Sequence, residues 1–374
     1  MKVGIAAIFK NEYPYILEWI AYHRSIGVDN FYIADNISND GSTELLEALD
    51  ELGVIKRIPF PRVNKNGPQA PAYNQIIQRY GHEVDLLGLI DADEFIVTEN
   101  GLKNDLNDFY QNDDFGAMGL NWKIYGSNND FFSTCGLVIE RFTQHSTSDY
   151  DNNRHIKTFV KPSYVERMAI HACTLKKGVY STSRNENMRF DDSKARTLEV
   201  SYENLYVNHY VVKSRIEHFI NKRKKGSAAG LATREKGIAY FKAHDENKLT
   251  SHFDINLINN VKHEIENLKS QMIAHTSFML LGRGHIDVNT ENRIISGWSF
   301  LENKRVPKYI KILVDDKEYK VVVDRERPDV INLGYASKLV CGFRLHLPQE
   351  IALNDKIIRG FIYGSIQDLK VSYR

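Results

Sequence analysis

Two aspartates, Asp91 and Asp93, follow an apolar run in the first hundred residues and are separated by one alanine. The run at 86–90 contains only leucine, glycine and isoleucine, and it ends abruptly at these acids and Glu94. Carboxylates this close together repel one another unless a cation neutralises them. Mg²⁺ and Mn²⁺ prefer hard oxygen ligands and need only one or two protein carboxylates when they bridge substrate phosphates. The pair therefore predicts a divalent-cation site that stabilises a departing diphosphate.

Two other interpretations of the acidic pair stay open. Asp-X-Asp occurs often by chance, and here it could form a solvated turn that caps a helix beginning near Phe95. A phosphatase-type site with an aspartyl nucleophile also places Asp-X-Asp after a strand. Similarity to that class would put threonine or valine at position 95, where this chain has Phe95, so the phosphatase interpretation is the weaker of the two.

The residues around the acidic pair alternate short apolar runs with amphipathic segments, which predicts a βαβ arrangement with a parallel sheet. The expected strands are 3–9, 31–35, 54–58 and 85–90, and the expected helices are 13–26, 43–52 and 71–80. Parallel sheets of this kind bind ligands outside the carboxyl ends of their strands. The polar residues that follow the strands are therefore candidate site residues, namely Lys10, Asn11, Glu12, Asp35, Asn36, Asp91, Asp93 and Glu94.

The rest of the chain changes character twice. Residues 115–212 show short strands separated by polar loops, which suits the half of an enzyme that binds an acceptor. Helices follow at 214–225 and 254–280, and apolar or alternating strands then run towards the last residue. We expect a nucleotide-binding α/β domain at 1–226, a helical linker region at 227–282 and a small all-β sandwich at 283–374.

The composition excludes several classes of partner and site. The 374 residues carry 49 Lys and Arg against 48 Asp and Glu, a formal net charge of +1, so no global field favours nucleic acid. Cys135, Cys173 and Cys341 lie far apart and lack the spacing of a zinc site or a disulfide framework. The first strand is too short to span a bilayer and lacks a signal-peptide cleavage pattern. We expect a cytoplasmic protein.

Several blocks of the sequence resemble one known family. Residues 9–29 and 31–42 are similar to the start of family-2-like bacterial glycosyltransferases, with family 92 as the nearest group. The acidic motif at 91–95 and the run Asn208-His-Tyr-Val-Val-Lys-Ser214 also resemble motifs of that family. The resemblance spans about residues 3–226 and implies a GT-A fold, which is a Rossmann-like domain that binds a nucleotide sugar.

The resemblance implies roles for individual residues. The nucleotide-sugar pocket would comprise Phe9, Lys10, Asn11, Glu12, Asp35, Gln69, Tyr73, Asp91, Ala92 and Lys213. His209 would complete the shell of a Mn²⁺ or Mg²⁺ ion held by Asp91 and Asp93, since imidazole is compatible with Mn²⁺. The alternative for His209 is a buried histidine bonded to a backbone carbonyl, and the alternative for Gln69 and Tyr73 is a place on a helix surface.

An inverting transfer also needs a carboxylate base on the acceptor hydroxyl, opposite the leaving group, and the metal-holding pair is badly placed for that duty. Asp149, Asp151 and Glu186 lie in polar loops of the acceptor half and are the candidate bases, although each alone has the pattern of a surface residue. Trp122 and Tyr125 could supply the flat apolar surface on which the acceptor sugar stacks.

A dense basic stretch follows the last motif. Its members are Lys213, Arg215, Lys222, Arg223, Lys224 and Lys225. Lys213 could reach a diphosphate oxygen. We expect the others to form a solvated helix face, with peripheral association at the inner face of the membrane as the lesser alternative. A homo-oligomer, if one forms, would use helix 254–280 or the C-terminal domain.

These patterns lead to one hypothesis and two alternatives. The hypothesis is a metal-dependent inverting glycosyltransferase that moves a hexose from a UDP-linked donor to a saccharide acceptor, in the assembly of a surface polysaccharide such as a capsule or lipopolysaccharide. One alternative is a carbohydrate- or nucleotide-binding protein that keeps the GT-A scaffold without turnover. The other is a nucleotidyltransferase, which shares the metal and phosphate chemistry but would release pyrophosphate rather than UDP.

Overall fold

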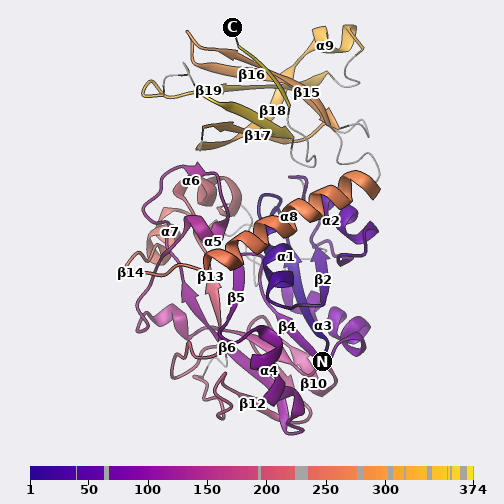
Figure 1. The fold of residues 1–374 in the computed structure, drawn as a ribbon, viewed down its shortest axis with the longest axis vertical. Coiled ribbons are helices and arrows are strands. Elements are labelled where there is room, and N and C mark those ends of the chain that lie inside the picture. Colours follow the sequence, from indigo (N-terminus) through magenta and orange to yellow (C-terminus); the bar gives the residue numbers. More distant parts are fainter. Residues whose placement is uncertain are drawn as a thin grey trace.

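The computed structural model forms an α/β domain that carries an all-β domain at one end (Figure 1). The described residues are 1–38, 40–62, 67–192, 195–223, 235–275, 282–301, 306–315, 317–334, 339–351, 353, 356–362 and 369–373. The predicted fold class, a Rossmann-like α/β domain followed by helices and a C-terminal all-β domain, is confirmed.

The α/β domain is built on one sheet, which has nine strands in the described part of the chain. Its first four strands are parallel and stand in the order β3-β2-β1-β4. They are β1 (Val3–Phe9), β2 (Asn30–Asp35), β3 (Lys56–Pro59) and β4 (Leu86–Leu89), connected by α1 (Ile16–Ser25), α2 (Ser42–Glu51) and α3 (Gln69–Tyr80). These elements agree with the sequence expectation, because each is specified by its own local apolar pattern.

The second half of the sheet comes from distant parts of the chain. Beyond β4 the order continues β9-β6-β13-β5, and β12 joins at β6. These strands are β5 (Glu94–Thr98), β6 (Phe115–Ile124), β9 (Ile156–Val160), β12 (Val179–Ser181) and β13 (Leu205–His209). Strand β6 is longer than the short strands expected for this part of the chain. Gly88 allows β9 to pair with β4, because a Cβ atom there would lie 2.8 Å from the ring of Phe159.

Short elements surround this sheet. They are η1 (Gly81–Glu83), α4 (Leu102–Gln111), β7 (Ser133–Thr134), α5 (Val138–Arg141), β8 (Gln144–His145), η2 (Asp151–Arg154), η3 (Pro162–Tyr164), β10 (Val165–Met168), β11 (Cys173–Leu175), α6 (Arg215–Glu217), the π-helical turn η4 (His218–Lys222), α7 (Ile238–His244) and β14 (Leu249–Thr250).

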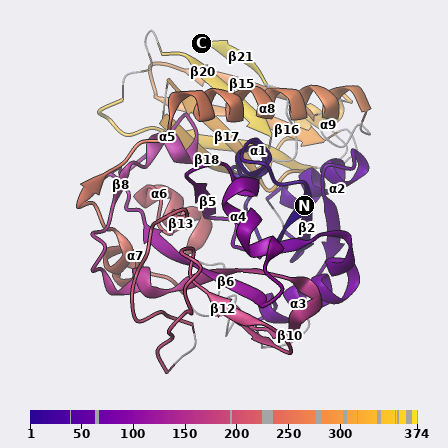
Figure 2. The same cartoon turned by 60° about the horizontal axis from the view of Figure 1, so that its bottom comes forward.

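The long helix α8 (Ile255–His275) belongs to the core of the α/β domain. Its buried stripe of Ile258, Val261, Leu268 and Met272 packs with the residues of that core. Figures 1 and 2 show the helix between α1 and the strands of the C-terminal domain. The apolar stripe predicted from the sequence is therefore used within the chain. Phe278, which belonged to the expected stripe, lies outside the described residues.

The C-terminal domain has a separate apolar core, formed by strands in the order β20-β17-β18-β19-β16-β15-β21. Its elements are β15 (Gly282–Asn289), β16 (Ile294–Leu301), β17 (Tyr309–Val314), β18 (Lys317–Glu326), α9 (Pro328–Asn332), β19 (Val340–His346), β20 (Ile358–Ile362) and β21 (Lys370–Tyr373). Strand β7 of the α/β domain adds to the edge of β18 and joins the two domains. None of the helices in the described ranges combines the length and apolar character that crossing a membrane requires.

Candidate active site

The acidic loop at 91–93 connects β4 to β5 at the carboxyl end of the parallel strands. The indole N–H of Trp19 in α1 lies 3.1 Å from the carbonyl oxygen of Asp91 and 2.9 Å from that of Glu94. The first helix therefore fixes the backbone of the loop. The alternative of a solvated turn that caps a helix at Phe95 is wrong, because residues 94–98 form β5 and Phe95 is buried.

Several donors contact the carboxylate of Asp91. Its Oδ1 accepts hydrogen bonds from the side-chain amide of Gln69 and from the hydroxyl of Tyr73, the latter at 3.2 Å. The ammonium of Lys157 in β9 lies 2.8 Å from the same oxygen and is fully buried. Gln69 and Tyr73, predicted to lie near the nucleotide, are thus brought to the acidic loop and are buried rather than on a helix surface.

The carboxylate of Asp93 has different neighbours. Antiparallel pairing of β5 with β13 sets Glu94 opposite His209, and the imidazole Nε2 of His209 lies 3.5 Å from Asp93 Oδ1. The ammonium of Lys222 in η4 forms a short ion pair with Asp93 Oδ2. The structure therefore brings His209 to Asp93, as the resemblance implied, and adds a lysine that was expected on a solvated helix face. For Lys222 that expectation is wrong.

Each aspartate of this cluster has an ammonium as its partner. Burial raises the pKa of both Asp91 and Asp93, but Lys157 and Lys222 outweigh it, so the pKa of each aspartate is below its ordinary value. Both ammoniums stay charged, since the same pairs hold the pKa of each lysine above its usual value against the opposing effect of burial.

The pKa values of the other two titratable groups of the cluster are shifted towards their neutral forms. Burial lowers the pKa of His209 to about 4, although Asp93 opposes it. Burial also raises the pKa of Glu94 well above its usual value, Lys157 opposes this, and the two aspartates raise it further. Asp91 and Asp93 thus each face one ammonium, that of Lys157 and that of Lys222.

The donor atoms at Asp93 and His209 fit a divalent cation. Two ligands of one octahedral ion at about 2.1 Å lie about 3 Å apart, close to the 3.5 Å between Asp93 Oδ1 and His209 Nε2. Among the described residues the imidazole Nδ1 of His209 is buried without a hydrogen-bond partner. No group of three or more His, Cys, Asp or Glu side chains in the described ranges has the spacing of a metal site. A cation here would need further ligands from substrate phosphates and water.

The predicted nucleotide edge forms a turn against the loop that follows β2. The ammonium of Lys10 donates to the carbonyl oxygens of Asn36 and Ile37 at 2.9 and 2.7 Å. The backbone N–H groups of Asn11 and Glu12 donate to the hydroxyls of Ser38 and Ser42. Phe9 is buried and packs edge-on against Trp19. Residues 9–12 therefore link the loop after β2 to the helix that supports the acidic loop.

Asp35 is fully buried at the end of β2 and forms an ion pair with Arg57. Its Oδ2 accepts from Nε of Arg57 at 3.0 Å, and a terminal nitrogen of the same guanidinium lies 2.9 Å away. Thr43 donates to its other oxygen at 3.2 Å. A role of Asp35 at the base or ribose stays a prediction, and any such contact would involve Arg57 as well.

A small cavity of about 20 Å³ joins the nucleotide edge to Asp93. Its lining is Glu12, Tyr15, Asp93, Val211, Val212, Lys213, Glu217, Asn221 and Lys222. Lys213 is buried with its ammonium 4.3 Å from the ring centre of Tyr15, and burial lowers its pKa. Ala92 is buried between the two aspartates. Glu12 and Lys213 both line this cavity, and their place in a nucleotide-sugar pocket stays a prediction.

The acceptor candidates lie in two environments. Trp122 in β6 is half-buried beside His209, with ring centres 4.3 Å apart, and stacks on His155 at 4.9 Å. Tyr125 is buried and packs on Tyr210. A sugar platform at this place would therefore be formed by Trp122 and its neighbouring histidines, and Tyr125 would support the platform from within the core.

The candidate bases are surface residues. Asp149 is exposed, Asp151 forms ion pairs with Arg196 and Arg154, and Glu186 lies 3.6 Å from Arg184. Asp151 begins the 3₁₀ turn that ends next to His155, the residue that stacks on Trp122. This turn makes Asp151 the candidate nearest in sequence to the Trp122 environment, and the identity of the base stays a prediction.

Lys157 and Lys222 are the site residues that the sequence interpretation missed. Lys157 carried a signal, because it lies inside the buried strand Ile-Lys-Thr-Phe-Val, where an unpaired lysine would be very costly. Lys222 carried none, since neighbouring basic residues share its pattern and only the fold decides which one points inwards. Lys224 and Lys225 lie outside the described residues.

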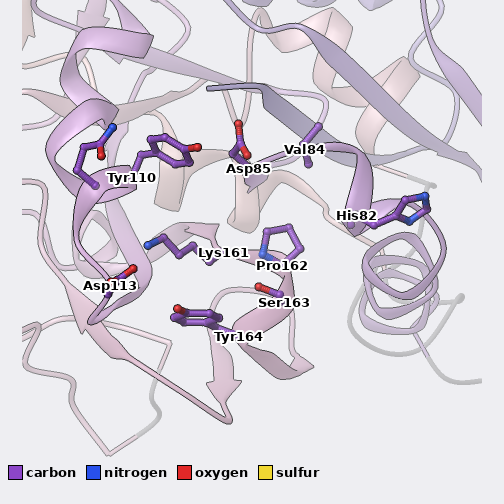
Figure 3. Close-up of a pocket in the computed structure, with 11 residues that line it drawn as sticks. His82, Val84, Asp85, Tyr110, Asp113, Lys161, Pro162, Ser163 and Tyr164 are labelled. Carbon is purple, nitrogen blue, oxygen red and sulfur yellow. The ribbon is translucent and has the colours of Figure 1, made fainter.

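A larger hollow of about 520 Å³ lies at the opposite end of the sheet, where β4 begins (Figure 3). Tyr110, Lys161 and Tyr164 line it, and Lys161 donates to the carbonyl oxygen of Asn112 at 2.6 Å. Parallel sheets bind ligands at the carboxyl ends of their strands. This hollow is therefore separate from the acidic loop and is not the nucleotide pocket.

Comparison with known proteins identifies relatives of the α/β domain. A family model described as glycosyltransferase family 92 matches residues 2–228. A family 92 protein of Arabidopsis thaliana is 24% identical over 201 residues, which cover 50% of this chain and 34% of that protein. One of Ricinus communis is 27% identical over 255 residues, which cover 62% of this chain and 42% of that protein. The chain thus matches well under half the length of these curated relatives.

Solved structures show weaker likenesses. Staphylococcus aureus TarS 1–349 in complex with UDP-GlcNAc aligns with a TM-score of 0.30 and 16% identity, over 44% of this chain and 46% of that one. Glucosyl-3-phosphoglycerate synthase from Mycobacterium tuberculosis, in complex with Mn²⁺, UDP and glucosyl-3-phosphoglycerate, aligns with a TM-score of 0.23 and 12% identity, over 32% and 44% of the two chains.

Proposed function

Because the chain belongs to glycosyltransferase family 92, we propose that it transfers a hexose from a UDP-linked donor to a saccharide hydroxyl, with inversion at the anomeric carbon. The observation that carries the proposal is the grouping of Asp93, His209 and Lys222 at the carboxyl end of the parallel strands. A carboxylate, a neutral imidazole and an ammonium together suit the binding of a diphosphate. The acceptor would be a growing surface polysaccharide, in line with the resemblance to bacterial glycosyltransferases.

The donor half of the reaction uses the acidic loop. In turnover the bond between the anomeric carbon and the β-phosphate oxygen breaks, and its electron pair leaves with UDP. Asp93 and His209 would hold a Mn²⁺ or Mg²⁺ ion, which supplies electrostatic stabilisation to the leaving diphosphate. Lys222 would release Asp93 and donate to the diphosphate, and Lys213 lies in the same cavity as a second cation. Asp91 would keep the loop in place through Gln69, Tyr73 and Lys157.

The charge balance of the cluster supports joint binding of cation and donor. A divalent cation alone would leave the cluster with excess positive charge, because Lys157 and Lys222 already neutralise Asp91 and Asp93. A diphosphate brings the compensating negative charge. We therefore expect the protein to bind Mn²⁺ much more tightly with UDP than without it.

The acceptor half needs one proton transfer. The acceptor hydroxyl oxygen forms the new bond to the anomeric carbon from the side opposite UDP, and its proton passes to a carboxylate base. Asp151 is our first candidate, with Asp149 and Glu186 behind it, because its turn leads to His155 and Trp122. Trp122 would carry the acceptor sugar on its apolar ring.

Release of UDP from UDP-linked sugars tests the proposal. We expect the purified protein to release UDP from at least one donor in the presence of Mn²⁺, and chelation to abolish this release. Asp93→Asn should lower turnover about a thousandfold, since it removes an interaction that strengthens as the diphosphate leaves. Its thermal unfolding midpoint should stay close to that of the unchanged protein, which separates lost chemistry from lost folding.

Two other outcomes would replace the proposal. Binding of UDP with no release from any donor, and no change in that binding in Asp93→Asn, would indicate a non-catalytic protein on the same scaffold. Release of pyrophosphate from a nucleoside triphosphate and a sugar phosphate would indicate a nucleotidyltransferase. A donor screen that measures UDP and pyrophosphate in parallel distinguishes all three.

A further inference from the structure

The short helix that carries Lys222 is bonded to the C-terminal domain. We call residues 215–222, which comprise α6 and η4, the lysine helix. Next to Lys222, the side-chain oxygen of Asn221 accepts a hydrogen bond from the ammonium of Lys320 in β18 at 2.8 Å. This bond joins residues 99 positions apart and crosses from the all-β domain to the α/β domain.

The bond from Lys320 continues into the donor site. The side-chain amide of Asn221 donates to the hydroxyl oxygen of Tyr15 at 3.1 Å, and this hydroxyl donates to Glu217 at 2.9 Å. Asn221, Tyr15 and Glu217 all line the small cavity that Asp93 and Lys222 share. A hydrogen-bonded path therefore runs from the C-terminal domain to the wall of the candidate active site.

The start of the lysine helix depends on the same domain contact. The backbone N–H groups of Arg215 and Ile216 donate to the carbonyl oxygens of Asp130 and Phe131, both at 3.0 Å. Strand β7 follows directly and pairs with β18, with Ser133 opposite Glu318. Strand β18 thus contacts the segment that holds the first turn of the lysine helix and also bonds to its last turn through Lys320.

A helix this short needs such contacts. Isolated helices of fewer than about twelve residues are marginal in water, and single π-helical turns are rare and occur mostly at functional sites. Lysine has a long side chain whose reach depends on where its backbone lies. An error of about 1 Å in a charged contact to a reacting group can cost a hundredfold in rate. The position of the last turn therefore matters for Lys222.

We propose that Lys320 is a positioning residue of the donor site, and that through Asn221 it fixes the turn that presents Lys222 to Asp93 and to the donor diphosphate. The inference rests on the proposed function, because the diphosphate is the partner of Lys222 in turnover. It gives the C-terminal domain a role in donor binding that does not require that domain to contact a substrate.

Kinetics of Lys320→Met test the inference. We expect kcat/KM for the UDP-linked donor to fall about tenfold, the size of one lost charge-assisted hydrogen bond, mainly through a higher KM and with an unchanged unfolding midpoint. Lys320→Arg should restore most of the loss. Lys308→Met is the matched control, since Lys308 is exposed in the same domain, also lies near the Tyr309 ring and has no bond to the α/β domain among the described residues.

A double-mutant cycle shows whether Lys320 acts through Asn221. If it does, Lys320→Met should add little further loss in an Asn221→Ala background, whereas losses that multiply would overturn the inference. Unchanged kinetics of Lys320→Met would also overturn it.

Amide hydrogen exchange of residues 215–222 gives a readout without turnover. We expect faster exchange in Lys320→Met than in Lys308→Met, and equal exchange would contradict the inference. If the unchanged protein neither binds nor turns over a UDP-linked sugar, the proposed function fails, and the exchange result still decides whether Lys320 orders the lysine helix.

Discussion

The two aspartates of the acidic loop are neighbours in sequence but belong to different parts of the molecule. Asp91 lies beside α3 and β9, where Gln69, Tyr73 and Lys157 converge on a single oxygen. Asp93 faces the end of β13 and the lysine helix, where Lys222 occupies one oxygen and His209 lies near the other.

This difference assigns different tasks to the two carboxylates. The side chain of Lys157 has no exposure to solvent, whereas that of Lys222 is 16% exposed and lies on a short helix. The partners of Asp91 come from regular elements of the sheet and its covering helix. We infer that Asp91 is mainly a structural centre that holds the loop, and that Asp93 is the carboxylate whose partners exchange during turnover.

The largest expected effect is on stability. Lys157→Met should lower the free energy of unfolding by about 3 to 4 kcal/mol, because it leaves Asp91 without its buried counter-ion. Lys222→Met, the matched change at Asp93, should cost less, about 1 to 2 kcal/mol, because the side chain of Lys222 is 16% exposed and water can partly replace it, whereas that of Lys157 is fully buried. Urea denaturation at pH 7 measures both. Equal losses in the two variants would remove the distinction between the aspartates.

The second expected effect is on the pH dependence of stability, and it comes from the buried His23 rather than from His209 of the site. His23 of α1 is fully buried, its Nδ1 lies 2.8 Å from the carbonyl oxygen of Trp19, and its Nε2 accepts from the N–H of Ile96 at 3.3 Å. The ring makes both hydrogen bonds only in its neutral form, with Nδ1 as the donor to Trp19 and Nε2 as the acceptor from Ile96. Burial lowers its pKa from 6.5 to about 3, although the bond to Trp19 opposes this.

The sign of the pH dependence follows from this depressed pKa. Between pH 6.5 and 3 the unfolded chain binds a proton at His23 that the folded protein excludes, so stability is lost as the pH falls. From pH 8 to pH 4.5 the loss from this group is about 3 kcal/mol. In His23→Leu the decline over this range should be smaller by that amount, as measured by urea denaturation at several pH values. An unchanged decline would show that His23 is not excluded from protonation.

A third effect concerns the cation. Lys222→Met leaves Asp93 without its ammonium, and we expect the affinity of the nucleotide-free protein for Mn²⁺ to rise about tenfold. The affinity for UDP in the presence of Mn²⁺ should fall, because the same lysine contacts the diphosphate. Calorimetric titration with Mn²⁺ alone and then with UDP measures both. Arg223→Met is the control, since the side chain of Arg223 is 41% exposed and pairs with Glu235 rather than with Asp93. Weaker binding of Mn²⁺ to Lys222→Met would contradict the charge balance.

The surroundings of Asp91 and Asp93 also differ in how far the sequence could predict them. Most elements around Asp91 lie in residues 3–89, where the strands and helices have their own apolar periods, so their order and the carboxyl-end location of the acids followed from local patterns. Lys157 of β9 is the exception, because it comes from a distant part of the chain. The resemblance to a known family added His209, which no local pattern connects to Asp93. The reach of Lys222 could not be predicted, because it depends on a π-helical turn held by β18, nearly a hundred residues later.

The smallest expected effect tests the acceptor side. Trp122 is half-buried beside His209, and among the described residues its indole N–H is buried without a partner, whereas Tyr125, just after the end of β6, packs against Tyr210. If Trp122 carries the acceptor sugar, Trp122→Phe should raise the acceptor KM about threefold to fivefold, since it loses ring area and one hydrogen-bond donor. Hydrolysis of the donor by water, which needs no acceptor, should be unchanged. Tyr125→Phe should change neither rate, and an equal rise of the acceptor KM in both variants would place the sugar elsewhere.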